Sequence, residues 1–429
     1  MHKKITEHSE RKGMGTMHKK ITEHRVYIEL MSFLAKAFLV LTLFFPAYYS
    51  SFDRHMYFMG LHWPYVILVL LMAMLFLKNC TKKWSNKRYV VPGLLLLAGY
   101  VLLSLYVNRV YHHWMWEEIH NTVSFLFAGM FMAYPHMTED FEFDLEKFLI
   151  HCIVLSVFCS LVFGCMGYER FYVCNHEITP VVLSKRYGES RMSWIYYHKS
   201  QYSMMLIVFM GFLYRYRNKF RTMVHFVTAQ VILAAALWMT HSWTAVLMAA
   251  LLWAGIVLDK ICEKKLWKNS KLWIATIPLL GAGCVLLGRL YSLIMAERDV
   301  STLGMRLPIW KASIAYISSH PWGVGKQFGD KILEVFPGFS TNNCHNVFLN
   351  AMYRFSVPVG GLFVLMLLGI LLFAFMRKKS FFAAGYLLAI IAVMTIDYAL
   401  QSNGTALFFL LVLLTLREEK ADITIQKVG

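Results

Sequence analysis

The sequence predicts an all-α, polytopic integral membrane protein with about twelve transmembrane helices, and three observations lead to this fold class. Apolar residues make up 58% of the 429 residues and charged residues only 16%, whereas soluble domains have roughly 45–50% and 25%. The mean hydropathy is +0.49. The apolar residues also gather into long runs. This composition argues against a disordered chain, a disulfide scaffold and an ordinary soluble enzyme.

The apolar runs define the expected helices. A spanning helix needs about 20 mostly apolar residues, because about 30 Å of hydrocarbon is crossed at about 1.5 Å per residue. Runs of this kind lie near 28–49, 62–78, 90–108, 119–135, 148–168, 200–216, 222–240, 242–258, 271–291, 357–376, 380–397 and 402–416. The last run is short and 242–258 follows its neighbour almost directly, so ten or eleven spans remain an alternative. We expect one transmembrane domain over 28–416, between a basic segment 1–27 and a tail 417–429.

The distribution of basic residues predicts the orientation of these spans. The formal net charge is +18, which in a soluble protein would suggest nucleic acid but in a membrane protein reports topology. With twelve spans, the loops on one face carry 28 basic residues and those on the other face carry 14, with Lys36 inside the first run. The positive-inside rule therefore predicts a multi-pass protein of the cytoplasmic membrane with both termini in the cytoplasm and no nucleic-acid partner.

Two loops on the outer face, 169–199 and 292–356, are much longer than the others. Long loops in compact proteins are commonly functional, so we expect any chemistry on this face. Of the eight cysteines, only Cys174 and Cys344 lie in these loops. A disulfide bond between them in an oxidising compartment stays open.

The larger loop contains an arginine and two histidines near polar and glycine residues. Arg306 can donate a forked pair of hydrogen bonds to phosphate oxygens. His320 and His345, the latter followed by Asn346, can exchange protons near neutral pH. Held near a membrane surface, these groups suit a phosphate-bearing lipid as ligand.

The smaller loop mixes basic and aromatic residues. Arg186, Arg191, His198 and Lys199 lie among Tyr187, Trp194, Tyr196 and Tyr197. Such a mixture can hold phosphate and stack on sugar rings. The alternative is structural, because aromatic and basic residues also collect at the membrane interface as anchors.

These residues together resemble the O-antigen polymerase and O-antigen ligase superfamily over roughly 185–416. The resemblance is carried by Arg306-Leu-Pro-Ile-Trp310, by His320-Pro-Trp-Gly-Val-Gly325, by His345-Asn346 and by the pair Gly360-Gly361. Upstream, Arg191-Met-Ser-Trp-Ile-Tyr-Tyr-His198 is similar to a stretch that these proteins carry before a span. Each motif is weak alone, and their order within a matching topology carries more weight.

The chain departs from the family pattern at two places. Lys199-Ser200 stands where the upstream motif usually has proline and asparagine, which puts the shape of that turn in doubt. In Met239-Thr-His-Ser-Trp-Thr-Ala245, Trp243 occupies the position of the family's arginine. One phosphate contact is therefore missing, unless a residue such as His241 supplies it.

The resemblance implies transfer of an oligosaccharide from a polyprenyl diphosphate, such as undecaprenyl diphosphate, to an acceptor hydroxyl on the outer face of the membrane. We expect Arg306 and Arg191 to stabilise the leaving diphosphate and His345 to act as the base. The substrate-binding candidates are His198, Lys199, Arg186, His320, Asn346 and His241. His320, which precedes Pro321, is also a candidate for shaping its loop. We expect no cofactor and no metal site, since the outer loops lack an Asp-x-Asp pair.

Several functional alternatives stay open. Polymerisation of polysaccharide repeat units needs only the lipid-linked unit as donor and acceptor, whereas a ligase would move finished polymer to a different acceptor. Other polysaccharide-assembly proteins would be natural partners in either case. A transporter or flippase for lipid-linked glycan is the alternative from another class, because twelve spans suit it.

Overall fold

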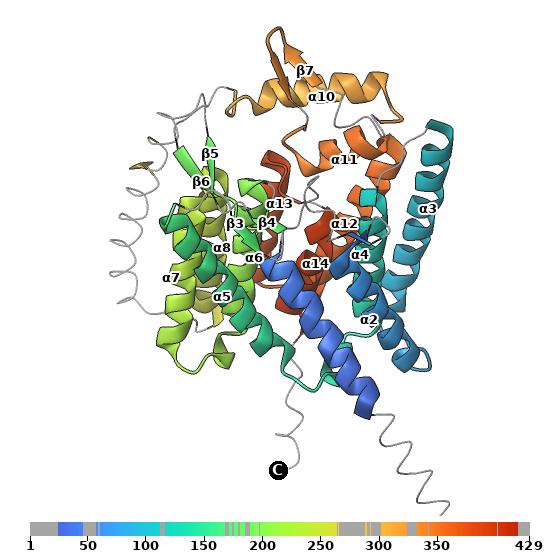
Figure 1. The fold of residues 1–429 in the computed structure, drawn as a ribbon, viewed down its shortest axis with the longest axis vertical. Coiled ribbons are helices and arrows are strands. Elements are labelled where there is room, and N and C mark those ends of the chain that lie inside the picture. Colours follow the sequence, from blue (N-terminus) through green and yellow to red (C-terminus); the bar gives the residue numbers. More distant parts are fainter. Residues whose placement is uncertain are drawn as a thin grey trace, which may run out of the picture.

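The computed structural model is predominantly helical over the residues that it describes (Figure 1). These residues are 25–45, 57–58, 61–111, 116–167, 171–173, 176–178, 181–184, 189–196, 198–263, 265, 288–289, 292, 302–323, 333–341, 343–400 and 402–418. The expected span 271–291 falls almost entirely outside them, as do Arg186 and Cys174.

The other expected runs coincide with helices. These are Arg25–Phe44, α2 (Trp63–Asn79), α3 (Lys87–Tyr111), α4 (Trp116–Ala133), α5 (Leu145–Cys165), α6 (Lys199–Arg215), α7 (Met223–Met239), α8 (Trp243–Glu263), α12 (Val357–Arg377), α13 (Phe381–Ile396) and α14 (Thr405–Thr415). Among the described residues, five helices are long and apolar enough to cross a membrane, namely Arg25–Phe44, α3, α5, α8 and α12. Shorter apolar helices are α2, α7, α13 and the segment Ser402–Thr415. These helices indicate a membrane-embedded protein.

Two helices lie at the centre of the bundle, shielded on every side. Every residue of α14, and α6 from Lys199 to Tyr214, is buried. α14 follows a 3-10 turn (η6, Ser402–Gly404) and has 11 residues. At about 1.5 Å per residue this is about 16 Å, well short of a hydrocarbon core of about 30 Å. The run 402–416 therefore forms a short helix in the core of the bundle, and its apolar residues pack against protein.

The two long loops, 169–199 and 292–356, contain secondary structure of their own. The larger one holds α10 (Arg306–Ser319), the antiparallel hairpin β7 (Leu333–Phe336) and β8 (Phe339–Thr341), and α11 (Val347–Phe355). The smaller one forms two antiparallel hairpins, β3 (Phe171–Val173) with β4 (His176–Ile178) and β5 (Val181–Ser184) with β6 (Glu189–Met192). A further short pair joins β1 (Tyr57–Phe58) and β2 (Leu61–His62), and 3-10 turns occupy η2 (Met137–Asp140) and η3 (Arg217–Lys219). Figure 1 shows α10 lying across one end of the bundle with β7 above it.

The helix that follows His345 is held in place by a glycine contact. A Cβ atom added to Gly360 of α12 would lie 2.6 Å from backbone atoms of Ala351 in α11. Real Cβ atoms do not come this close, so only glycine lets the two helices approach in this way. Gly361, the second residue of the glycine pair, has nothing within 4 Å of its added Cβ. The position of α11 therefore depends on the first glycine.

We expect Gly360→Ala to destabilise the fold by about 1–3 kcal/mol, because the added methyl group must push α11 away from α12. The measurement is the thermal unfolding midpoint of the purified protein in detergent. Gly361→Ala is the matched control and should leave the midpoint near that of the wild type. Equal midpoints for the two variants would contradict the close contact.

Candidate functional site

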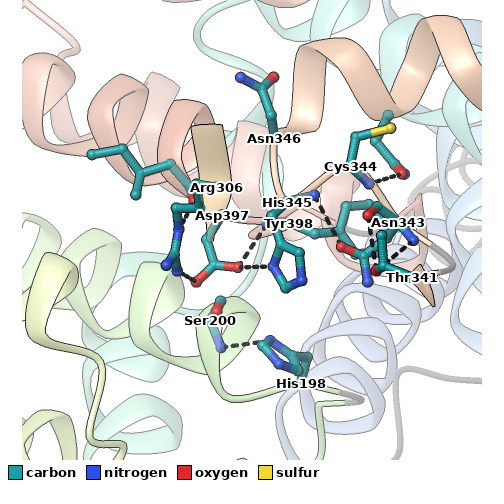
Figure 2. A network of polar contacts seen from close by, with 12 residues as sticks. His198, Ser200, Arg306, Thr341, Asn343, Cys344, His345, Asn346, Asp397 and Tyr398 are labelled. Atoms are coloured by element: carbon teal, nitrogen blue, oxygen red, sulfur yellow. Dashed lines mark hydrogen bonds and ion pairs between the residues drawn. The ribbon is translucent and has the colours of Figure 1, made fainter. Parts of the chain in front are cut away.

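A buried carboxylate joins two of the residues that the sequence singled out. Asp397 Oδ2 accepts a hydrogen bond from Arg306 Nη2 at 3.0 Å, and its Oδ1 pairs with His345 Nδ1 at 3.2 Å. The backbone N–H of Tyr398 also donates to Oδ1, at 3.0 Å. Figure 2 shows the carboxylate between the guanidinium and the imidazole. Residues from three separate segments therefore converge at one point.

The end of α13 places Asp397 at this point. The helix stops at Ile396, and Asp397 adopts an extended conformation with φ −146° and ψ 164°. Burial by itself raises the pKa of this carboxyl, but the hydrogen bond with His345 and the charge of Arg306 overcome that effect and hold the pKa well below its usual range. Asp397 is therefore an anion at neutral pH.

A strained turn presents Arg306. Leu303, Gly304 and Met305 all have positive φ (50°, 63° and 75°), and α10 begins directly after them. Such left-handed conformations are costly for residues other than glycine and recur where a side chain must be held in place. The strain is accompanied by a hydrogen bond of 3.3 Å from Arg306 Nη1 to the Leu303 carbonyl oxygen.

Most of the hydrogen-bonding capacity of Arg306 is used inside the protein. Its Nε donates to the Ile396 carbonyl oxygen at 2.5 Å, in addition to the bonds with Leu303 and Asp397. Its side chain is only 11% exposed. Three of its five N–H donors already hold protein oxygens, so two remain for the expected fork onto a diphosphate. The Arg306 side chain is therefore placed to hold the Asp397 carboxylate in position.

His345 is held in a defined orientation. Its φ is 44°, its N–H donates to Asn343 Oδ1 at 3.0 Å, and its carbonyl oxygen accepts from Trp310 Nε1 at 3.4 Å. In the neutral form of the ring, an ionised Asp397 at Nδ1 favours the proton on that nitrogen and leaves the lone pair on Nε2. The His345 side chain is 28% exposed, against 6% for Asp397. The imidazole is therefore accessible to a ligand while its carboxylate partner is not.

Asn346, which we expected to contact substrate, has a structural task. It is the N-cap of α11, and its Oδ1 accepts from the N–H groups of Phe348 and Leu349 at 2.9 and 3.0 Å. Its Nδ2 donates to the Thr395 carbonyl oxygen at 2.8 Å. Figure 2 shows this amide directed away from His198. Asn346 therefore fixes the start of the helix next to His345.

His198 approaches the same site from the other half of the chain (Figure 2). It is the N-cap of α6, and its Nδ1 accepts the N–H of Ser200 at 3.3 Å. Accepting at Nδ1 places the proton of the neutral ring on Nε2. Burial lowers the pKa of His198, and the charges of His345, Lys199 and Arg191 lower it further, against the opposing effect of Asp397. His198 is therefore a neutral hydrogen-bond donor at pH 7.

Lys199 directly follows this histidine, and Arg191 lies close enough for its charge to act on the ring. Lys199 is buried, and its Nζ donates to the His241 carbonyl oxygen at 2.8 Å. Arg191 lies on β6, opposite Val182 in the hairpin, and is half-buried. The charges of Lys199 and Arg191 both act on the His198 ring. Positive charge is thus concentrated on the α6 side of the site.

His320 does not join this group. It is exposed at the end of α10, where its ring stacks on Tyr316 with centroids 4.3 Å apart. The following Pro321 carbonyl accepts from Val357 N at 2.8 Å, which ties this turn to the start of α12. Of the two expectations for His320, its position favours shaping of the loop over contact with the site.

An ion pair braces the site from the first half of the chain. Arg354 of α11 donates through Nη2 to Glu117 Oε1 of α4 at 2.7 Å and through Nη1 to the Tyr398 hydroxyl at 3.0 Å. Tyr398 directly follows Asp397. The helix that begins after His345 and the segment that holds Asp397 are therefore both connected to α4.

Cys344 is buried and its thiol is free, so it forms no disulfide bond in this structure.

Among the described residues, no group of three or more histidine, cysteine, aspartate or glutamate side chains is arranged to hold a metal ion.

Comparison with known proteins adds no further constraint. No protein-family model matches this chain, and no curated protein matches it. The interpretation of the site therefore rests on its geometry and on the residue motifs.

Sequence reasoning missed Asp397 as a member of the site. The available signal was an acidic residue at the C-terminal end of a strongly apolar run, where an ionisable group is costly and is usually paired. That signal identifies the residue as important but does not identify its partners, which lie 91 and 52 positions away in the chain.

The pH dependence of stability offers a check on His198. Its pKa in the unfolded chain is about 6.5, and its folded-state pKa is lower. The unfolded chain therefore binds a proton at this histidine more readily than the folded protein does. The free energy of unfolding is highest above about pH 6.5 and decreases as the pH falls below that value. Asparagine is a good N-cap, so His198→Asn should keep α6 intact. The measurement is the thermal unfolding midpoint in detergent. We expect the midpoint of this variant to fall less than that of the wild type when the pH is lowered from about 7.5 to about 5.5, a range that brackets the pKa of histidine in the unfolded chain.

His151→Asn is the matched control, since His151 is exposed on α5. It should behave like the wild type. An unchanged pH response in His198→Asn would mean that His198 is not held in the neutral form.

Proposed function

We propose that this protein is a membrane glycosyltransferase that moves an oligosaccharide from a polyprenyl diphosphate to a sugar hydroxyl on the outer face of the cytoplasmic membrane. The preferred reaction is polymerisation of polysaccharide repeat units. The observation that carries the proposal is the His345–Asp397 pair, an accessible imidazole oriented by a buried carboxylate, with His198 and two cationic side chains beside it. The family resemblance in the same residues gives the substrate class.

The geometry suits activation of a hydroxyl group. In the proposed reaction His345 Nε2 accepts the proton of the acceptor hydroxyl, and Asp397 stabilises the imidazolium that forms. The acceptor oxygen forms a bond to the anomeric carbon of the donor sugar. The bond between that carbon and the diphosphate oxygen breaks, and polyprenyl diphosphate leaves with the electron pair. Base catalysis of this kind contributes about 10²- to 10⁴-fold to a rate.

The leaving diphosphate gains negative charge and needs fixed donors. In this proposal Arg191 and Lys199 supply the positive charge, and His198 Nε2–H donates a hydrogen bond without adding charge. In this proposal Arg306 holds Asp397 and does not bind the diphosphate, because its N–H groups already donate to the Ile396 carbonyl oxygen and to the Asp397 carboxylate. This arrangement places the base on the α11 side and the cations on the α6 side of one site.

Two other functions can use parts of this structure. A ligase would employ the same groups with a different acceptor. A transporter or flippase is favoured by a different observation, namely the ionisable pair Glu117–Arg354 inside the bundle, because such residues often mark substrate or ion pathways.

Reconstitution separates these functions. The purified chain in lipid nanodiscs is incubated with a diphosphate-linked oligosaccharide, and longer glycan and free polyprenyl diphosphate are measured. Their formation supports the transferase, and transport in vesicles without cleavage of the C–O bond would refute it. In a strain that lacks the protein, loss of chain length indicates a polymerase, whereas accumulation of unattached polymer indicates a ligase.

A further inference from the structure

Three exposed aromatic residues meet at the end of α10 that lies away from Arg306. The rings of Tyr111 and Trp322 are stacked, with centroids 5.0 Å apart and an interplanar angle of 16°. The ring of Tyr106 meets Trp322 edge-on at 6.3 Å. The three residues, here called the aromatic platform, are 37–50% exposed. No part of the candidate site uses them.

The Tyr111 end of the platform lies beyond the hydrocarbon core if α3 crosses the membrane from its basic start. The helix opens with Lys87 and Arg88 and continues for 25 residues. Tyr111 is therefore about 35 Å along the axis from Arg88, and a tilt of about 20° still leaves about 32 Å across a core of about 30 Å. Tyr106, about 27 Å along the axis from Arg88, lies in the outer part of the core, whereas Tyr111 and the Trp322 ring stacked on it lie beyond the lipid chains. The exposed rings of Tyr111 and Trp322 are thus available to a molecule at the outer surface.

Rigid elements connect the platform to the candidate site. Arg306 is the first residue of α10 and Trp322 follows its end, about 20 Å away for a helix of 14 residues. Figure 1 shows α10 extending along the end of the bundle toward α3. A Cβ atom on Gly323, which has φ +79°, would lie 2.7 Å from Ser356 N. The turn that carries Trp322 is therefore held tightly against the start of α12.

The chemistry of the platform suits a carbohydrate. The face of an aromatic ring is electronegative and attracts the weakly positive C–H groups on the face of a sugar ring. Tyrosine hydroxyls and the indole N–H can exchange hydrogen bonds with sugar hydroxyls at the same time. A chain of several sugars leaving His345 along α10 would reach these rings. We propose that the aromatic platform binds the glycan chain several sugars away from the bond that is transferred.

This inference rests on the proposed function and adds a distal binding site to it. A second contact would keep the growing glycan near His345 between transfers. The first linkage requires only the candidate site, so it should not depend on the platform. Chain length, by contrast, should depend on it.

The test uses Trp322→Ala in the full-length protein, produced in a strain that lacks the wild-type copy. Surface polysaccharide is separated by length on gels, and the amount of single-linkage product is measured. We expect markedly shorter chains with an unchanged amount of first linkage. Trp322→Phe, which keeps a ring, should restore most of the length. Trp238→Ala is the matched control, because Trp238 is also exposed and lies near the end of α7.

Wild-type chain lengths in Trp322→Ala would overturn the proposal, as would equal shortening in Trp238→Ala. Loss of the first linkage at normal protein levels in the membrane would overturn it too, because it would place Trp322 in the transfer step. If a strain without the protein makes normal glycan, the proposed function fails independently. The platform is then tested by saturation-transfer NMR with oligosaccharides released from the strain's own surface polysaccharide. Binding weakened by roughly 3- to 10-fold in Trp322→Ala supports the platform, and unchanged binding refutes it.

Discussion

Asp397→Asn should reduce glycan transfer by about 10²- to 10⁴-fold while the protein remains inserted in the membrane. The asparagine oxygen would keep the bond with the charged Arg306, so its NH₂ group would face His345 Nδ1. The imidazole would then have to accept at Nδ1 and carry its proton on Nε2. A histidine in that tautomer cannot take a proton from the acceptor hydroxyl. The measurement is the initial rate of glycan elongation in nanodiscs.

The matched control for this variant is an aspartate of α8 that contacts the other end of α13. Asp259 Oδ1 accepts the N–H of Phe381, the first residue of α13, at 3.0 Å. Asp259→Asn keeps an acceptor there and changes the same type of residue, so its transfer rate should stay within a few-fold of wild type. Wild-type turnover in Asp397→Asn would remove the His345–Asp397 pair from the reaction, whatever the fate of the fold.

Arg354→Ala should destabilise the protein by about 3 kcal/mol or more, which is typical when one partner of a buried ion pair is removed. The arginine side chain is 13% exposed, and its loss leaves Glu117, at 27%, without its 2.7 Å partner. It also removes the donor to the Tyr398 hydroxyl, next to Asp397. We therefore expect a loss of transfer activity in addition to a lower unfolding midpoint. Equilibrium unfolding in mixed detergent micelles measures the free energy.

Two comparisons test the cause of that loss. The double variant Glu117→Ala with Arg354→Ala removes both charges and should recover part of the stability. Lys260→Ala, which removes half of the Lys260–Glu263 pair on the more exposed surface of α8 (34% and 56%), should change stability by less than about 1 kcal/mol. If Arg354→Ala costs no more than Lys260→Ala, the pair is not a brace of the site.

The helices were largely predictable because hydrophobic burial in a bilayer is a property of local composition. The run 90–108, for example, could be identified without knowing any of its neighbours, and α3 covers it. The run 402–416 shows the limit of this argument. An apolar segment looks the same whether lipid or protein surrounds it, and only the packing shows that α14 is buried along its whole length.

The candidate site was predictable in its parts but not in its connections. The motifs pointed to Arg306, His345 and His198 on chemical grounds, and the structure places all three near Asp397. The sequence also assigned Arg306 to a phosphate and Asn346 to a substrate. Both assignments depend on which oxygen or nitrogen atoms lie within hydrogen-bond distance, and no local pattern contains that information.

The amino-acid sequence by itself determined the class of this protein, its apolar helices and the side chains in its two long loops that are able to carry charge or a proton. These properties follow from the hydropathy and chemistry of residues close together in the chain. Only the tertiary structure decided that Asp397 orients His345, that Arg306 is committed to that carboxylate, and that Arg354 reaches Glu117 over 237 positions. The physical reason is that such pairs are selected by helix packing, which brings together groups whose separation in sequence carries no signal.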